Sequence, residues 1–244
     1  MTRDARAVLF DMDGVIVDSE VYWHEFEKSR ILPAVLDEGT DTDSNGDGGE
    51  RPDVEETTGM NFREIYDYLD ANYDVAVEKS EFVDIYERTA REIYTERVTL
   101  MDGFRELCAD LHEAGATTGI VSSSPRAWIS LVRERFGLDV DTVVSAEDID
   151  ELGKPEPAVY EHAAAVIGVE PDECVVVEDS ANGTRAAARA GAAVIGYRGE
   201  ANADHALPAA DVVVSGPKVL RAELRRRLEP DLERGGRSTS NSDA

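Results

Sequence analysis

Four short stretches of the chain hold carboxylates, hydroxyls and one lysine, the groups that handle phosphate and divalent cations. Asp11 and Asp13 follow the apolar run AVLF, and a glycine stands directly behind the second aspartate. The stretches VSSS, GKPEP and VVVEDS supply the other groups, namely Ser122, Ser123, Ser124, Lys154, Glu178 and Asp179. An apolar run precedes the serines and the acidic pair as well, so their spacing points to strand ends.

Carboxylates crowded together require a cation, and a set of oxygen ligands favours Mg²⁺ over zinc. A cation with a lysine and hydroxyl groups forms a cradle for a phosphoryl group. Asp11, aimed at the phosphorus, can act as nucleophile and form an aspartyl-phosphate. Asp13 can donate a proton and later accept one, while the glycine lets the backbone turn closely around the metal. These residue types therefore predict phosphoryl chemistry at one shared site.

Each of these residues also has a simpler interpretation. Asp13 beside a glycine is typical of a surface turn, and Lys154 of a solvated helix start. The Glu178–Asp179 pair is typical of a charged helix N-terminus. Their occurrence together at successive strand ends favours the shared site.

The serines after Ser122 are more ambiguous. A backbone amide of Ser123 or Ser124 can bind phosphate, but helix capping by itself explains a serine before Pro125. Both interpretations stay open.

The elements that would position these residues follow an alternating pattern. Strands are predicted at Ala7–Phe10, Thr118–Val121, Val143–Val144, Cys174–Val177, Ala193–Gly196 and Asp211–Val214. Helices are predicted at Gly103–Glu113, Pro125–Phe136, Glu156–Ile167, Ala181–Ala190 and Lys218–Leu228. Buried apolar runs alternating with amphipathic segments indicate an α/β fold with a Rossmann-like parallel sheet. Ligands bind beyond the carboxyl ends of such strands, so the four stretches are expected to meet at one rim.

A helical block interrupts this pattern after the first strand. It is predicted to contain helices at Ser19–Leu36, Phe62–Tyr73 and Glu78–Thr95, without a strand. We interpret residues 19–100 as a helical cap inserted into an α/β core formed by residues 1–18 and 101–229. Within the cap, the acidic and glycine-rich residues 37–56 predict a mobile loop. Residues 230–244 predict a disordered tail.

The acidic loop contains half of a calcium-loop pattern. Asp41, Asp43, Asn45 and Gly46 match its first positions. The twelfth position requires a glutamate, and Pro52 stands there instead. A solvated acidic insertion is the favoured interpretation.

The charge composition indicates the kind of solvent in which the protein works more than it indicates a binding partner. The 244 residues have a formal net charge of −27 at pH 7, which argues against binding to nucleic acid or anionic membranes. The chain has only four lysines beside 52 acidic residues, a balance that resembles proteins of salt-loving cells. Concentrated salt screens such self-repulsion within a few ångströms.

Two further features indicate a cytoplasmic protein. No apolar run approaches the length of a membrane span, and the start MTRDAR lacks the apolar core of a signal peptide. Cys108 and Cys174 stand inside apolar patterns, which predicts buried free thiols rather than a disulfide or a metal site.

In their order, DMDGVIVDS, VSSS, GKPEP and VVVEDS resemble the four motifs of the haloacid dehalogenase-like superfamily. The place of the helical insertion resembles the members with a C1 cap. By this resemblance Asp11 is the nucleophile and a Mg²⁺ ligand, and Asp13 is the acid/base with its backbone carbonyl on the metal. The resemblance also implies the remaining roles: Ser122 holds the phosphoryl group, Lys154 stabilises its charge, Asp179 binds Mg²⁺, and Glu178 assists directly or through water. The predicted phosphate-binding residues are then Ser122, Lys154 and, as the more ambiguous candidate, Ser123.

The resemblance favours phosphate hydrolysis over its alternatives. The branches that attack carbon or cleave phosphonates lack Asp13. A phosphosugar mutase of the β-phosphoglucomutase type must hold two phosphates, yet a histidine of its cap aligns with Trp23 here, and its two lysines align with Thr58 and Pro125. A non-catalytic phosphate-binding module is the other alternative, which the intact acidic residues and Lys154 disfavour.

The cap is expected to select the substrate by closing over the rim. Its candidate residues are Trp23, His24, Met60, Asn61 and Arg63, and Arg126 of the core is another. Each also suits a structural role, as packing, as a half-exposed helix residue or as a surface charge. We therefore predict a Mg²⁺-dependent phosphatase of small phosphomonoesters, such as sugar phosphates or phosphoglycolate, working as a monomer or homodimer.

Overall fold

The computed structural model describes residues 5–36, 52, 62–199, 202–203 and 206–228. The calcium-like stretch, the tail at 230–244 and all of the acidic loop at 37–56 except Pro52 lie outside the described residues. Met60 and Asn61 lie outside them too, and the side chain of Arg63 is not described.

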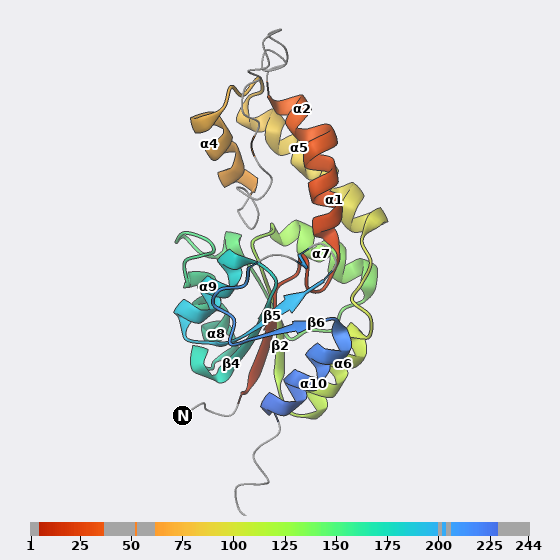
Figure 1. Cartoon of the computed structure of the whole chain (residues 1–244), viewed down its shortest axis with the longest axis vertical. Coiled ribbons are helices and arrows are strands. Elements are labelled where there is room, and N and C mark those ends of the chain that lie inside the picture. Colours follow the sequence, from red (N-terminus) through yellow and green to blue (C-terminus); the bar gives the residue numbers. More distant parts are fainter. Residues whose placement is uncertain (1–4, 37–51, 53–61, 200–201, 204–205, 229–244) are drawn as a thin grey trace, which may run out of the picture.

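A six-stranded parallel sheet forms the centre of the core (Figure 1). Its strands are β1 (Ala7–Phe10), β2 (Thr117–Ser122), β3 (Thr142–Ser145), β4 (Cys174–Glu178), β5 (Ala193–Arg198) and β6 (Val212–Ser215). They lie in the order β3-β2-β1-β4-β5-β6. The predicted α/β fold with a Rossmann-like sheet is confirmed, and every predicted strand is present with ends that differ by two residues at most.

Strand β1 occupies the middle of the sheet, between β2 and β4. All four of its residues are buried because the sheet is covered on both faces. Val8 and Phe10 pack on the side of α6 (Phe104–Glu113) and α10 (Pro217–Leu228), while Ala7 and Leu9 pack on the side of α8 (Ala158–Ile167) and α9 (Ala181–Ala190). A continuous apolar run suits this position, since no residue of the strand faces water.

The remaining core elements connect the strands. Helix α7 (Arg126–Phe136) follows β2, and the short 3₁₀ turns η4 (Ala146–Asp148) and η5 (Pro171–Glu173) follow β3 and precede β4. The predicted start of α8 at Glu156 was wrong by two residues: the helix begins at Ala158, and Lys154 lies in the loop before it, not at a helix start. The cysteines are buried free thiols, as predicted.

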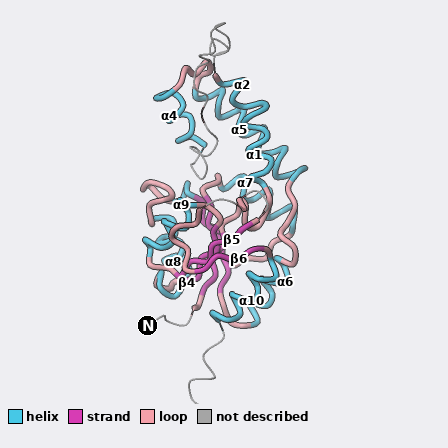
Figure 2. Tube along the Cα trace, in the orientation of Figure 1, coloured by secondary structure: helices cyan, strands magenta, loops and turns pink. Residues whose placement is uncertain are grey.

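The cap helices, defined here as the elements between Ser19 and Arg97, lie beyond the carboxyl edge of the sheet (Figure 1). They are α1 (Ser19–Phe26), the π-helical η1 (Glu27–Ile31), α2 (Leu32–Val35), α4 (Phe62–Asn72), α5 (Lys79–Glu92) and the π-helical η3 (Ile93–Arg97). Figure 2 shows helices and loops in this part, whereas the strands gather in the core. The exact domain limits stay a prediction.

The two chain segments that join cap and core lie side by side. The backbone N–H of Thr99 donates to Oδ1 of Asp18 at 2.6 Å. A bridge also pairs Val17 with Leu100, so entry to and exit from the cap are tied together. Among the described helices, none is both long and apolar enough to cross a membrane.

Candidate active site

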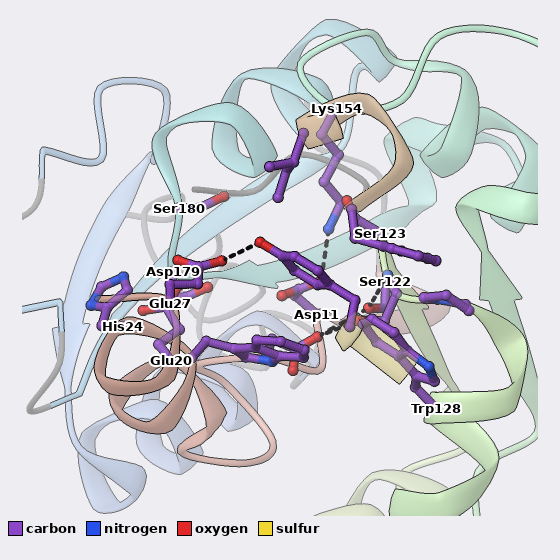
Figure 3. Close-up of a pocket in the computed structure, with 17 residues that line it drawn as sticks. Asp11, Glu20, His24, Glu27, Ser122, Ser123, Trp128, Lys154, Asp179 and Ser180 are labelled. Carbon is purple, nitrogen blue, oxygen red and sulfur yellow. Dashed lines mark hydrogen bonds and ion pairs between the residues drawn. The ribbon is translucent and has the colours of Figure 1, made fainter. Parts of the chain in front are cut away.

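The residues predicted to do chemistry meet at the carboxyl edge of the sheet, where they face the cap helices (Figure 3). The core side of this cavity is lined by Asp11, Asp13, Ser122, Ser123, Ser124, Lys154, Asp179 and Ser180. The cavity encloses about 120 Å³, whereas one water needs roughly 10–15 Å³. Its volume therefore suits a small molecule.

A buried lysine joins two strand ends at the base of the cavity. The ammonium Nζ of Lys154 lies 2.7 Å from Oδ1 of Asp11 and 2.6 Å from Oε1 of Glu178. Its side chain is only 4% exposed. Burial alone would lower the pKa of Lys154, but the two carboxylates outweigh it and hold that pKa well above the usual value. The lysine therefore stays charged beside Asp11.

Glu178 is not among the residues that line the cavity, and both of its carboxylate oxygens accept hydrogen bonds. Its Oε1 accepts from Lys154 and, at 2.8 Å, from the hydroxyl of Tyr160. Its Oε2 accepts from the backbone N–H groups of Asp179 and Ser180 and from the Ser180 hydroxyl, each at 3.1 Å. These contacts make Glu178 a positioning residue for Lys154, and they favour a supporting over a direct role at a metal.

The acidic cluster fits a hard divalent cation. Asp11, Glu178 and Asp179 each place one carboxylate oxygen within 4.8 Å of the others, and all three residues are buried. Burial and the neighbouring acids raise the pKa values of Asp11 and Asp179 well above the usual range. One lysine does not balance this many buried carboxylates, so a bound cation would offset the remaining charge.

Glu20 belongs to this cluster, although sequence reasoning missed it. It follows the first motif directly and lines the cavity from the start of α1. Burial raises its pKa to about 7, with a further contribution from Asp13. Its Oε2 is buried and has no hydrogen-bond partner among the described residues. The Glu20 carboxyl also hydrogen-bonds to Asp179, so it lies beside the acidic cluster, and its Oε2 is the oxygen that a cation there could approach.

The first motif requires a glycine at position 14, because the backbone there lies very close to the Asp179 carboxylate. Gly14 has a φ of +77°, and a Cβ added there would lie 1.9 Å from Oδ2 of Asp179. Asn202 holds Asp179 from the other side, because its Nδ2 donates to the Asp179 carbonyl at 3.1 Å. The loop after β1 is thus packed directly against the carboxylate of Asp179.

Asp13 connects the cap to the core. Its Oδ1 accepts from the hydroxyls of Ser19 at 2.6 Å and Tyr94 at 2.7 Å, both on the cap side. Its Oδ2 accepts from the hydroxyl of Ser124 at 2.8 Å. The Tyr94 hydroxyl in turn accepts from Nε1 of Trp23 at 3.1 Å. Burial raises the pKa of Tyr94 well above its usual value, so its hydroxyl keeps the proton that it donates.

The substrate candidates have different placements. Trp23 and His24 line the cavity, and Trp23 also packs between the rings of Tyr86 and Trp128. Arg126 is not among the cavity-lining residues, and its guanidinium pairs with Asp148. A substrate role for these residues stays a prediction.

Sequence reasoning missed most of the cap-side lining. Besides Glu20, these residues are Glu27, Phe62, Ile65, Tyr86 and, from the core, Trp128. A signal was present for one of them: Glu27 follows Glu20 by seven positions, with Trp23 and His24 three and four positions after Glu20. That spacing places all four on one helical face. The others reach the cavity only through tertiary packing.

A parallel sheet with a buried acidic cluster at its carboxyl edge, faced by helices inserted after the first strand, defines a Rossmann-like core with an inserted helical cap. Comparison with known proteins agrees. The sequence model of the haloacid dehalogenase-like hydrolases matches residues 5–191. This match covers most of the chain, so the chain belongs to the haloacid dehalogenase-like hydrolases, a family of enzymes.

The relatives include named phosphatases. Hexitol phosphatase B of Escherichia coli (strain K12) is 32% identical over 184 residues, covering 74% of this chain and 78% of that protein. The phosphatase candidate YhcW of Bacillus subtilis is 32% identical over 190 residues, covering 76% and 80%. A solved β-phosphoglucomutase of Clostridium difficile is similar with a TM-score of 0.67 and 22% identity, covering 92% of this chain and 97% of that one. At that identity the likeness shows the fold alone.

Glu27 gives a prediction on stability. Burial raises its pKa to about 7 from 4.5, although the Tyr86 hydroxyl opposes the shift. In this window the folded chain holds a proton that the unfolded chain has released, so stability is lost as pH rises from about 4.5 through about 7. Replacing Glu27 with glutamine removes this effect. We expect urea unfolding to show that the free energy of unfolding of Glu27→Gln rises, relative to that of wild type, by up to about 3 kcal/mol between pH 4.5 and pH 8.

The difference in the free energy of unfolding between the two proteins removes the contribution of the other acidic residues, which both proteins share. A wild-type minus variant difference that does not change with pH would contradict a buried and elevated carboxyl at this position.

Proposed function

We propose that this enzyme is a Mg²⁺-dependent phosphatase of small phosphomonoesters, such as sugar phosphates or phosphoglycolate, working through an aspartyl-phosphate. The observation that supports it most is the setting of Asp11. Its carboxylate lies at the end of the central strand, touches the Lys154 ammonium at 2.7 Å, and shares a buried cluster with Asp179. Oxygen ligands with one lysine suit a phosphoryl group with its metal.

In the first half-reaction, the Asp11 carboxylate attacks the phosphorus. The bond from phosphorus to the ester oxygen breaks, and protonated Asp13 gives its proton to that leaving oxygen. An alcohol departs, and the phosphoryl group stays on Asp11. Lys154 and the hydroxyl of Ser122 stabilise the charge on the transferred group. When bound by Asp11, Asp179 and the backbone carbonyl of Asp13, Mg²⁺ supplies further neutralisation of this charge.

In the second half-reaction, Asp13 accepts a proton from a water that attacks the same phosphorus. The bond between phosphorus and the Asp11 oxygen breaks, which restores the carboxylate and releases phosphate. The sum is one ester and one water converted to one alcohol and one phosphate. The hydroxyls of Ser19, Tyr94 and Ser124 donate to the Asp13 carboxylate and orient it for this role.

The relatives support this reaction, since two of them are named for phosphatase activity. Small phosphorylated metabolites are cytoplasmic compounds, and we propose the same location for this enzyme. The partner is then a small metabolite, and no macromolecule is needed for turnover.

The first test measures phosphate release from a panel of phosphomonoesters in concentrated KCl, with Mg²⁺ or with EDTA. We expect release that requires Mg²⁺, that Asp11→Asn abolishes and that Asp13→Asn lowers about 10²- to 10⁴-fold. Asp70→Asn, an exposed aspartate of α4, is the matched control and should retain full activity. Isomerised sugar phosphate in place of free phosphate would indicate a mutase, and binding without turnover would indicate a binding module.

A second test uses the contact between Gly14 and Asp179. Gly14→Ala would press a methyl group onto the Asp179 carboxylate, and misplacement by about 1 Å can cost about 10² in rate. Both kcat and the Mg²⁺ concentration for half-maximal activity should change. Gly216→Ala is the matched control, because Gly216 has the same φ of +77° and its added Cβ meets nothing within 4 Å. Equal effects of both substitutions would show that backbone strain, and not the Asp179 contact, is responsible.

A further inference from the structure

Four aromatic rings, three from the cap and Trp128 from the core, are linked in a closed circuit of contacts beside the cavity. Trp23 stacks on Tyr86 with centroids 5.5 Å apart and on Trp128 with centroids 5.4 Å apart. Phe62 completes the circuit, at 5.8 Å from Tyr86 and 5.0 Å from Trp128. All four rings line the cavity. Nothing in the phosphoryl chemistry of the core requires this aromatic circuit.

One carboxyl group lies among these rings. Glu27 lines the cavity from the start of η1, and the residue is only 9% exposed. The Tyr86 hydroxyl donates to its Oε1 at 3.1 Å, the one side-chain hydrogen bond that affects its carboxyl among the described residues. A carboxyl buried among rings is costly unless it gains partners. Glu27, which Figure 3 shows at the cavity, therefore offers its second carboxyl oxygen as an acceptor, and Tyr86 offers its hydroxyl oxygen as another.

The charges of the cavity-lining residues that the structure describes disfavour a second anionic group on the ligand. The acidic lining residues are Asp11, Asp13, Glu20, Glu27 and Asp179. The basic ones among the described lining residues are Lys154 and His24. Lys154 is held at the base by Asp11 and Glu178, so it serves the phosphoryl group. A carboxylate on the leaving group would meet Glu20 and Glu27 instead.

We propose that Glu27 and Tyr86 determine the substrate by binding a hydroxyl of the leaving group, while the four rings pack against its carbon skeleton. The substrate is then the phosphate ester of a neutral, polyhydroxylated carbon chain or ring, a sugar or sugar alcohol, and not phosphoglycolate. This inference rests on the proposed phosphatase activity and narrows it. Ligand hydroxyls can donate to the second carboxyl oxygen of Glu27 and to the hydroxyl oxygen of Tyr86, whose own proton goes to Glu27, while the apolar faces of such a chain pack on the aromatic rings.

The expected discrimination is large. A site built to hydrogen-bond a hydroxyl rejects an analogue without it, because the buried polar groups of the site are left unpaired. Glycolate lacks the polyhydroxylated chain and adds a negative charge. Wild-type kcat/KM should therefore favour sorbitol 6-phosphate over phosphoglycolate by at least about a hundredfold.

The experiment compares kcat/KM for sorbitol 6-phosphate, phosphoglycolate and p-nitrophenyl phosphate, the last as an ester without aliphatic hydroxyls. In Glu27→Gln and in Tyr86→Phe, the ratio of sorbitol 6-phosphate to p-nitrophenyl phosphate should fall at least about tenfold, mainly through KM. Glu25→Gln is the matched control, since Glu25 is an exposed residue near the end of α1, two positions before Glu27, and lies outside the cavity lining. It removes the same charge and should leave the ratio unchanged.

The outcomes separate this inference from the proposed function. If phosphoglycolate is the better substrate, the inference is overturned and the proposed phosphatase activity stands. The same holds if Glu27→Gln lowers kcat/KM equally for sorbitol 6-phosphate and p-nitrophenyl phosphate. Absence of turnover for every ester by the folded wild type with Mg²⁺ overturns the proposed function and this inference with it. Two variants are used so that a folding defect in one of them does not decide the result.

Discussion

The buried ammonium of Lys154 between Asp11 and Glu178 is the interaction on which the site depends. Removing a lysine and carboxylates from water costs several kcal/mol per ion unless they are paired closely. The pairing at 2.6–2.7 Å meets that requirement and ties the central strand β1, its neighbour β4 and the loop before α8 to one point. Lys154 neutralises only part of the negative charge of Asp11, Glu178 and Asp179. The ion pairs that join the two strand ends therefore leave a negative charge that a bound cation would balance.

Asp13 extends this constraint to the cap. Its two oxygens accept from hydroxyls on both sides of the boundary, so the cap position and the orientation of this carboxylate are linked. The Trp23 indole continues the link through Tyr94 into the aromatic circuit. A leaving group bound in the cap half would therefore contact the same residues that orient the acid/base.

The sequence predicted the sheet well and the site in part, for physical reasons. A strand buried on both faces must be apolar throughout, so Ala7–Phe10 was identified with its correct ends. The chemical groups follow strand ends, which made their meeting predictable. The ion pairs of Lys154 could not be predicted, because its partners Asp11 and Glu178 are distant in the sequence and leave no local pattern. Tyr86 and Tyr94 were missed for the same reason, since their contacts with Glu27 and Asp13 span 59 and 81 positions.

The measurement that tests the account most directly is detection of the phosphorylated enzyme. Wild-type protein turning over its best ester with Mg²⁺ is quenched in acid, digested and analysed by mass spectrometry, beside Asp11→Asn treated in the same way. The account predicts the mass of one phosphoryl group on the peptide that contains Asp11, removable with hydroxylamine and absent from the variant. A phosphoryl group on another residue, or none on the enzyme during confirmed turnover with samples quenched on the timescale of a single cycle, would contradict it.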